Sequence, residues 1–215
     1  MSVSLPNGAI VAIASGYGSA LTVSAITNAN PGVATSTAHG LSNGDFVEVT
    51  SGWSRLTNKV VRVSGVTANT FNLENIDTTL TTIYPAGTGT GTVRKVTGYT
   101  QLSQILSSSS NGGEQQFLEY QFLESDAQKR IPTFKSAAGL TMSVADDISQ
   151  PGFVLAAVAN DDRLQRAVKI TLPSASILSY NAFISVNKTP TLTVNELMAC
   201  EVTMSLQAEP VRYAS

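Results

Sequence analysis

The side chains that most often carry enzyme chemistry are scarce in this chain. It has one histidine, His39, and one cysteine, Cys200. A Ser-His-Asp triad would have to use His39, which lies in the turn-like tripeptide Ala38-His39-Gly40, where a histidine ordinarily hydrogen-bonds to the backbone. Cys200 lies on the apolar side of an alternating segment, which predicts a buried thiol rather than a nucleophile. One histidine and one cysteine far apart in the chain cannot form a zinc site.

Acidic pairs and a glycine-rich run are the next candidates for chemistry. Asp146-Asp147 and Asp161-Asp162 flank an expected helix, and helix-end or turn roles explain them better than an oxygen-only metal site. The run Gly87-Thr88-Gly89-Thr90-Gly91 precedes an expected strand and has no lysine partner, so it does not match a phosphate-binding loop. We therefore predict no metal site and no cofactor.

Two further patterns are considered and set aside in favour of structural roles. Trp53 with Tyr84 is a candidate sugar-binding platform, but packing of Trp53 within a turn is favoured. Paired carboxylates of a glycosidase are also sought, although nothing in their spacing selects them over solvated strand residues. The candidate pairs are Glu119 with Glu124 and Glu201 with Glu209. We therefore predict no catalytic residue and expect that the protein is not an enzyme.

The charge of the chain argues against nucleic-acid recognition. Charged residues make up 13% of the 215 residues and the net charge is −2. Lys and Arg are scattered, whereas a DNA-binding protein needs a basic stripe. Outside residues 20–96 the chain has 8 Lys and Arg against 11 Asp and Glu. Scarce charge suits a surface that neighbouring proteins cover.

The segment Leu197–Glu209 alternates strictly between apolar and polar residues. Side chains of successive strand residues point to opposite faces, so this pattern predicts one long strand with an apolar face and a wet, mildly acidic face. The apolar side would carry Met198, Cys200, Val202, Met204, Leu206 and Ala208, and the polar side Glu201, Thr203, Ser205, Gln207 and Glu209. A polar face without catalytic groups suits the surface of a structural assembly better than an active site.

Residues 20–96 have the texture of a small β domain. Short strands follow one another at regular spacing with Gly and Asn turns, which predicts a small barrel or sandwich. The expected strands are Leu21–Thr27, Val33–Thr37, Phe46–Thr50, Val60–Val66, Thr70–Leu73 and Thr92–Val96. A strand over Ala9–Ala14, ended by Ser15-Gly16-Tyr17-Gly18, precedes this domain, and Asp77–Gly91 is expected to be a long exposed loop.

The remainder of the chain is expected to be mixed. Thr100 is expected to cap a helical turn that reaches Leu106, followed by a flexible linker, Ser107–Gly113. Glu114–Ser125 reads as a strand that touches the core on one side and a partner on the other. Ser149 is expected to cap an amphipathic helix with Pro151 in its first turn, ending near Asn160. The other expected strands are Leu140–Ala145, Ala167–Leu172 and Ile177–Val186.

No apolar run approaches the roughly 18 residues of a membrane span, so no membrane partner is expected. The first residues, Met1–Gly8, lack the basic start of a signal peptide. A single cysteine excludes an intrachain disulfide. We therefore expect a soluble protein made in a reducing cytosol.

Two stretches resemble known families. The segment from Ser19 to Val96 resembles the small β-barrel module of ubiquitin-activating enzymes, which recurs in phage structural proteins. The resemblance rests on Ala38-His39-Gly40-Leu41, Gly44-Asp45, Asn58 and Asn69-Thr70-Phe71-Asn72-Leu73. It concerns the fold and implies no activity.

The rest of the chain resembles the major tail tube proteins of long-tailed phages. The resemblance rests on "GGEQQFLEYQFLESDAQKRIPTFKSA", on the helix "QPGFVLAAVANDD", on the following strands, and on the closing Pro210-Val211-Arg212-Tyr213. It implies a mainly β subunit, with a tail-tube β-sandwich or barrel (residues 1–19 and 97–215), one flanking α-helix, and an inserted β-barrel (residues 20–96) outside the tube.

The resemblance also implies partners and a place in the cell. Such subunits form hexameric rings that stack into a tube around a tape-measure protein, meet the tail terminator and distal tail proteins, and let DNA pass without specific binding. The protein would assemble in the host cytoplasm and end in the virion tail. The alternative is a virion decoration or carbohydrate-binding protein that acts through the inserted barrel.

The alternating segment supplies the residues expected to face the lumen of such a tube. A bore that conducts DNA must not grip phosphate, because each Lys or Arg contact adds a salt-dependent bond. The lumen-facing residues are then Glu201, Thr203, Ser205, Gln207 and Glu209. Lys169 and Lys188 in neighbouring strands are counter-examples whose direction the sequence leaves open. Arg130–Lys135, together with Ser107–Gly113, is expected to form a long loop that stacks one ring on the next.

Overall fold

The computed structural model describes residues 7–214, which are mainly β with one helix. The expectation that Met1–Gly8 is not the start of a signal peptide therefore falls largely outside the described residues. The elements are β1 (Ile10–Val23), β2 (Ala25–Ile26), β3 (Gly32–Thr35), β4 (Phe46–Ser51), β5 (Val60–Ser64), β6 (Thr70–Leu73), β7 (Gly91–Leu102), β8 (Ile105–Asn111), β9 (Gln115–Tyr120), β10 (Lys129–Lys135), β11 (Gly139–Ala145), α1 (Pro151–Asp162), β12 (Arg166–Thr171), β13 (Ile177–Val186), β14 (Ala199–Leu206) and β15 (Val211–Tyr213). The predicted mainly β fold with one helix is confirmed.

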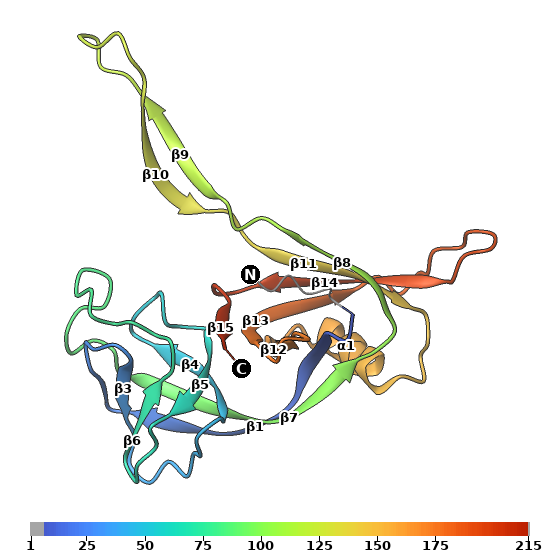
Figure 1. Ribbon diagram of the computed structural model, residues 1–215, viewed down its shortest axis with the longest axis horizontal. Coiled ribbons are helices and arrows are strands. Elements are labelled where there is room, and N and C mark those ends of the chain that lie inside the picture. The colour runs from blue at the N-terminus through green and yellow to red at the C-terminus, as the bar shows by residue number, and fades with distance from the viewer. Residues whose placement is uncertain (1–6, 215) are drawn as a thin grey trace.

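One antiparallel sheet of 13 strands runs through the molecule, in the order β2-β3-β6-β5-β4-β7-β1-β12-β13-β14-β11-β8, with β15 on β13. Its first strands fold into a barrel. Only Ser24 separates β1 from β2, so pairing of β1 with β7 and of β2 with β3 closes the ladder through β6, β5 and β4. We call this part the barrel; it lies at the lower left of Figure 1.

Two long strands, β1 and β7, run from the barrel into the rest of the sheet (Figure 1). The sequence predicts that a strand ends at Ser15–Gly18, but β1 continues through these residues to Val23. Its register with β7 shifts between Ala14 and Ala20, and a Cβ on Gly16 would lie 2.8 Å from the Thr97 hydroxyl. Glycines that permit bulges therefore bend the strand without ending it. The boundaries at residues 20 and 96 fall within continuous strands, and the division into two domains stays a prediction.

Helix α1 covers one face of the sheet formed by β1, β12, β13, β14, β11 and β8. Phe153, Ala156 and Ala159 are buried against strand residues such as Val202 and Met204 in one core cluster. The helix begins close to β7, because a Cβ on Gly152 would lie 2.1 Å from the Gln101 carbonyl oxygen. Only glycine fits such an approach.

The start and the outer side of α1 correct the sequence prediction. Gln150 is the N-cap residue and makes no side-chain capping bond, whereas Ser149 donates its hydroxyl hydrogen to Asp147 at 2.6 Å. Pro151 occupies the first turn as predicted. Val154 and Val158 are about half exposed, at 48% and 49%, so the helix is apolar on its outer side too.

A second core fills the barrel and continues to its junction with the sheet, where Val211 and Tyr213 of β15 belong to the same cluster. Buried hydroxyls make hydrogen bonds across this junction. The Arg62 N–H donates to the Tyr213 hydroxyl at 2.8 Å, and the Ala167 N–H donates to the Tyr17 hydroxyl at 2.7 Å. Packing and hydrogen bonds therefore join the barrel to the sheet.

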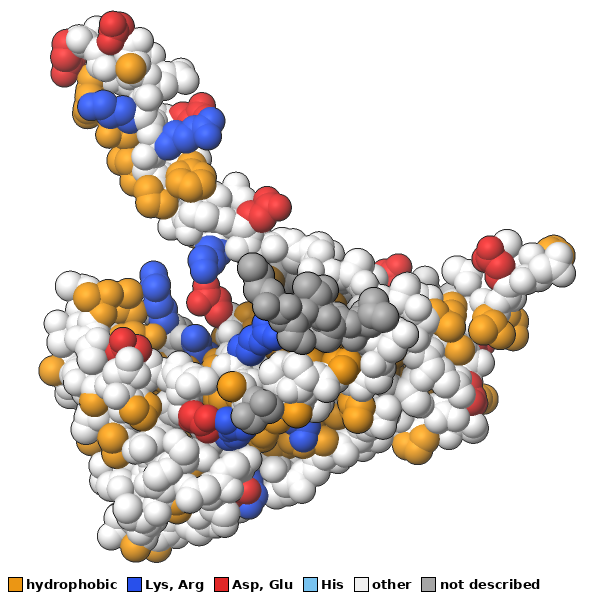
Figure 2. Space-filling view, in the orientation of Figure 1, with side chains coloured by type: hydrophobic (Ala, Val, Ile, Leu, Met, Phe, Trp, Pro, Cys, Tyr) orange, Lys and Arg blue, Asp and Glu red, His pale blue; other side chains and the backbone are white. Residues whose placement is uncertain are grey.

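Two protrusions leave this body. Strands β9 and β10 form a two-stranded hairpin of their own, and the residues between β13 and β14 form a long loop, the two arms at the upper left and right of Figure 1. The predicted strand from Glu114 touches no core, because its large apolar residues are exposed on both sides. Those of the whole hairpin are Phe117, Leu118, Phe122, Leu123, Ile131 and Phe134. Figure 2 shows them along the arm, with acidic side chains at its tip.

The segment before this hairpin also differs from the prediction. The expected helical turn from Thr100 to Leu106 is the end of β7 and the start of β8, and the expected linker Ser107–Gly113 is mostly strand. Strand β8 pairs with β11 and, among the described strands, forms an open edge of the sheet. The predicted stacking loop at Arg130–Lys135 is likewise strand β10.

Candidate functional site

The polar side of β14 continues across its neighbouring strands. Glu201, Thr203 and Ser205 lie opposite Ser143, Thr141 and Gly139 of β11. Because directly paired residues of antiparallel strands share a face, hydroxyl groups from both strands form one surface. We call this surface the hydroxyl face. Its members are Ser107, Ser109 and Asn111 of β8, Gly139, Thr141 and Ser143 of β11, Ser185 of β13, and Glu201, Thr203 and Ser205 of β14.

The hydroxyl face is almost free of charge. Glu201 is its one ionisable residue and accepts a hydrogen bond from the Thr203 hydroxyl at 3.4 Å. Phe183, 38% exposed, lies opposite Ser205 and is an apolar neighbour at the rim of this surface. The opposite side of β14 carries Cys200, Val202 and Met204, all buried beneath α1. One side of the sheet is therefore core, and the other offers hydroxyl groups to solvent.

The two lysines of the neighbouring strands do not disturb this surface. The Lys169 ammonium lies over the Tyr99 ring at 4.4 Å, at the junction with the barrel. Lys188 pairs with Asp161 of α1 at 2.9 Å, which places it on the helix side of the sheet. The cations nearest in sequence to this face are thus turned toward other partners.

The last two residues of the predicted lumen set lie elsewhere. Strand β14 ends at Leu206, whereas the alternating pattern predicts a strand from Leu197 to Glu209. The Gln207 N–H donates to the Asn181 carbonyl oxygen at 2.8 Å, and the chain then turns toward β15. Glu209 forms an ion pair with Lys135 at the base of the hairpin. Met198, predicted on the apolar side, precedes the strand and is half exposed.

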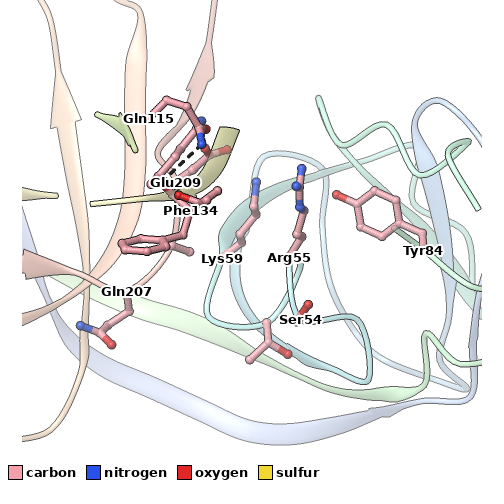
Figure 3. Close-up of a pocket in the computed structure, with 12 residues that line it drawn as sticks. Ser54, Arg55, Lys59, Tyr84, Gln115, Phe134, Gln207 and Glu209 are labelled. Carbon is pink, nitrogen blue, oxygen red and sulfur yellow. Dashed lines mark hydrogen bonds and ion pairs between the residues drawn. The ribbon is translucent and has the colours of Figure 1, made fainter. Parts of the chain in front are cut away.

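A cleft of about 400 Å³ lies where the barrel, the hairpin base and the Gln207–Glu209 turn meet. Arg55 and Lys59 point into it side by side from the barrel, and Phe134 lies opposite (Figure 3). Burial lowers the pKa of Lys59, the neighbouring cations add to this effect, and Glu209 opposes it. The hydrogen bond from Lys135 lowers the pKa of Glu209. The cleft therefore holds three cations against one carboxylate.

Comparison with protein families identifies the chain. A family model described as "Phage tail tube protein, TTP" matches residues 51–215. The chain belongs to the phage tail tube protein family. No curated protein matches the chain. The family match begins within the predicted barrel insertion, so it includes β5, β6 and β7 as well as the sheet and hairpin.

A phage tail tube protein is a structural component of the virion tail, and His39 and Cys200 have structural roles in this one. His39 is buried and its Nδ1 accepts a hydrogen bond from the Leu41 N–H at 3.1 Å, the backbone role predicted for it. Cys200 is buried as predicted, and burial followed by the charge of Asp146 raises the pKa of its thiol. In residues 7–214, no cluster of His, Cys, Asp or Glu suits a metal ion.

The acidic pairs near α1 serve helix ends and turns, as predicted. Asp147 accepts hydrogen bonds from Ser149, Gln150 and Gln104, which hold the pKa of its carboxyl well below the ordinary value. Asp162 forms an ion pair with Arg166 in the turn after the helix. Within the described chain, no helix is long and apolar enough to cross a bilayer.

Trp53 and Tyr84 do not form a sugar platform, and the packing role favoured for Trp53 is confirmed. Trp53 is 1% exposed, and its Nε1–H donates to the Pro85 carbonyl oxygen at 2.9 Å. Tyr84 packs edge-on against it at 5.1 Å and is itself buried. The glycine-rich run packs here too, because a Cβ on Gly89 would lie 2.8 Å from the Trp53 ring. The Asp77–Gly91 segment is therefore a loop as predicted, but one that covers the barrel core.

Sequence reasoning missed most of the hydroxyl face. Thr141 and Ser143 alternate with apolar residues in a strand that the sequence does predict, so their side was readable, but their pairing with β14 was not. Ser107 and Ser109 lie in a run of serines, which does not alternate between apolar and polar residues, so the sequence does not show which way their side chains point. The cleft that contains Arg55, Lys59 and Lys135, here called the basic cleft, brings together residues from positions 54 to 209. No local sequence pattern marks it.

Proposed function

We propose that this tail tube protein forms stacked hexameric rings in the tail of a long-tailed phage, of the siphovirus type, and that the hydroxyl face lines the bore through which DNA passes during ejection. The observation that carries the proposal is this face, with hydroxyl groups from four neighbouring strands, β8, β11, β13 and β14, and one carboxylate. A wall without cations releases no counterions from DNA, so it offers no salt-dependent grip on phosphate.

The open edge of β8 supports association in a ring. Its outer backbone groups pair with no strand of residues 7–214, and its side chains from Leu106 to Asn111 are exposed. An open edge is an aggregation hazard in a monomer and a ready contact in an assembly. Pairing of this edge with a neighbouring subunit would continue the hydroxyl face around a closed annulus.

The hairpin supports stacking of one ring on the next. An isolated two-stranded hairpin is marginal in water, and this one exposes large apolar side chains on both sides. Contact with another subunit would bury these apolar side chains away from water. The tape-measure protein would occupy the bore during assembly, and the tail terminator and distal tail proteins would meet the two ends of the tube. The barrel would lie on the tube exterior, with the module of ubiquitin-activating enzymes as its suggested relative.

Electron microscopy of the purified protein at high concentration tests this proposal. Rings or tubes with a central hole are expected, and antibodies against the protein should label phage tails along their length. Particles that stay monomeric at every concentration, together with label confined to heads or to one tail end, would contradict it. A virion decoration or carbohydrate-binding protein would give that result.

Deletion of the hairpin tests its stacking role. Replacing residues 116–133 with Asn-Gly keeps the backbone bond from the Ser136 N–H to the Glu114 carbonyl oxygen at 2.8 Å. The monomer should lose no more than about 0.5 kcal/mol of unfolding free energy, because the removed side chains lie outside both cores. Rings should form without long tubes, and long tubes of normal length from this variant would refute the stacking role.

A further inference from the structure

The cleft beside the hairpin base has unbalanced positive charge. Lys135 pairs with Glu209, whereas Arg55 and Lys59 take part in no ion pair with any residue from 7 to 214. Phe134, 70% exposed, forms an apolar patch on the opposite wall. In Figure 3 the ends of Arg55 and Lys59 lie next to each other, and the Tyr84 hydroxyl points toward Arg55. The cleft thus combines an uncompensated pair of cations with an aromatic surface.

The tip of the hairpin has the opposite character. Between β9 and β10 the chain carries Glu124 and Asp126, which form no ion pair with any described residue. Leu123 is fully exposed and Phe122 is half exposed beside them. The tip therefore presents two carboxylates next to two apolar side chains, which matches the cleft in both charge and apolar content.

The tip cannot reach the cleft of its own subunit. Strand β9 has six residues, or roughly 20 Å of extended chain, and it leads away from the base where the cleft lies (Figure 1). Figure 2 shows basic side chains on both walls of the hollow at the base and acidic ones at the far end of the arm. If the tip and the cleft meet, they therefore belong to different molecules.

We propose that the hairpin tip of one subunit docks into the basic cleft of a second copy in the adjacent ring, with Glu124 and Asp126 facing Arg55 and Lys59. The apolar residues Phe122 and Leu123 then pack against Phe134. This inference rests on the proposed function and names the surface that receives the stacking hairpin. Burial, followed by the charges of Arg55 and Lys135, lowers the pKa of Lys59, and an added carboxylate would offset the repulsion among these cations.

Cysteine cross-linking gives a direct test, because the natural Cys200 is buried. Ser54→Cys places a thiol in the cleft and Ala127→Cys places one at the exposed tip. Tubes of the double variant, oxidised and run on a non-reducing gel, should give a ladder that extends beyond the ring size, because each bond links two rings. Each single variant is the control and should remain free of this ladder.

Each outcome decides the inference. A ladder that stops at the ring size would place the contact within a ring and overturn it, and so would intact tubes without cross-links. A second double variant carries Ser54→Cys with Thr193→Cys, which lies in the β13–β14 loop. Cross-links in this variant, with none between Ser54→Cys and Ala127→Cys, would also overturn the inference. If the unmodified chain formed no tubes, that result would instead contradict the proposed function itself.

Charge exchange provides a second, independent measurement. Glu124→Lys with Asp126→Lys should reduce the amount of sedimentable tube by at least about tenfold, and Arg55→Glu with Lys59→Glu should do the same. Subunits that carry all four substitutions should recover tubes, because the attraction is restored with its sign inverted. Circular dichroism confirms that each monomer is folded. Normal tubes from either reversed pair, or no recovery in the fourfold variant, would contradict the inference.

Discussion

Replacing Tyr213 with phenylalanine tests the junction that holds the barrel against the sheet. The ring of Tyr213 is fully buried, with the Arg62 guanidinium 4.6 Å from its centroid and Phe46 edge-on at 5.9 Å. Its hydroxyl accepts the Arg62 N–H at 2.8 Å. Burial raises the pKa of this hydroxyl to about 12, in keeping with a group removed from water. Phenylalanine keeps the packing of the ring and removes only the hydroxyl group.

The expected loss follows from the donor that remains. A backbone N–H left without an acceptor in a partly buried position costs about 1–2 kcal/mol. For a chain of this length, that lowers the melting temperature by roughly 2–4 °C per kcal/mol. Urea denaturation followed by circular dichroism should show a lower midpoint with an unchanged slope. Two separate unfolding transitions in the variant would also show that the barrel and the sheet unfold independently.

A matched control is Tyr120→Phe. Tyr120 lies on the hairpin with its ring against Phe122 at 5.3 Å, outside both core clusters. Its loss of the hydroxyl should change the unfolding free energy by less than about 0.5 kcal/mol. If Tyr213→Phe behaved like this control, the junction would not depend on the Tyr213 hydrogen bond and the reasoning would be wrong.

Three further results are expected. Trp53→Phe should cost about 1–3 kcal/mol in urea denaturation, because the smaller ring leaves a cavity and the Nε1–H bonds to Pro85 and Thr88 are lost. A neutral result would contradict the turn-packing role. Asp147 has a lowered pKa in the folded chain, so its stabilising effect is present above about pH 4 and disappears as the pH falls further. Between pH 4 and 2, the unfolding free energy of Asp147→Asn should therefore fall less steeply than that of the unmodified chain. An equally steep fall in both proteins would refute this. Cys200 should react with a thiol reagent only in urea, and rapid labelling of the folded protein would show that it is not buried.

The sequence predicts best where one face of an element is buried and the other is wet. The alternation around Val202 and Met204 correctly predicts β14 and its two faces, because side-chain direction in a strand has a period of two. The same rule fails past Leu206, where the pattern continues through Gln207 and Glu209 but the backbone turns. There the hydrogen bond to Asn181 and the ion pair to Lys135 decide the conformation, and both partners are distant in sequence.

Strand β8 and the hairpin show what local patterns cannot supply. Ser107–Ser110 has the composition of a linker, yet it is a strand because β11 offers it an edge. The apolar residues of β9 predict contact with the core on one side and with a partner on the other. Neither side reaches the core, and the contact with a partner stays a prediction. These side chains are exposed in the single subunit, so the sequence of one chain indicates an apolar surface but not what covers it. The basic cleft depends on tertiary contacts in the same way.

The most direct test of the central claim is a cryo-electron microscopy map of the assembled tube in which β14 can be traced. The expected map shows a closed ring of subunits with Glu201, Thr203 and Ser205 directed into the bore, flanked by the hydroxyl groups of β11 and β8. A map with these three side chains on the outside of the tube, or packed between protomers away from the bore, would contradict it.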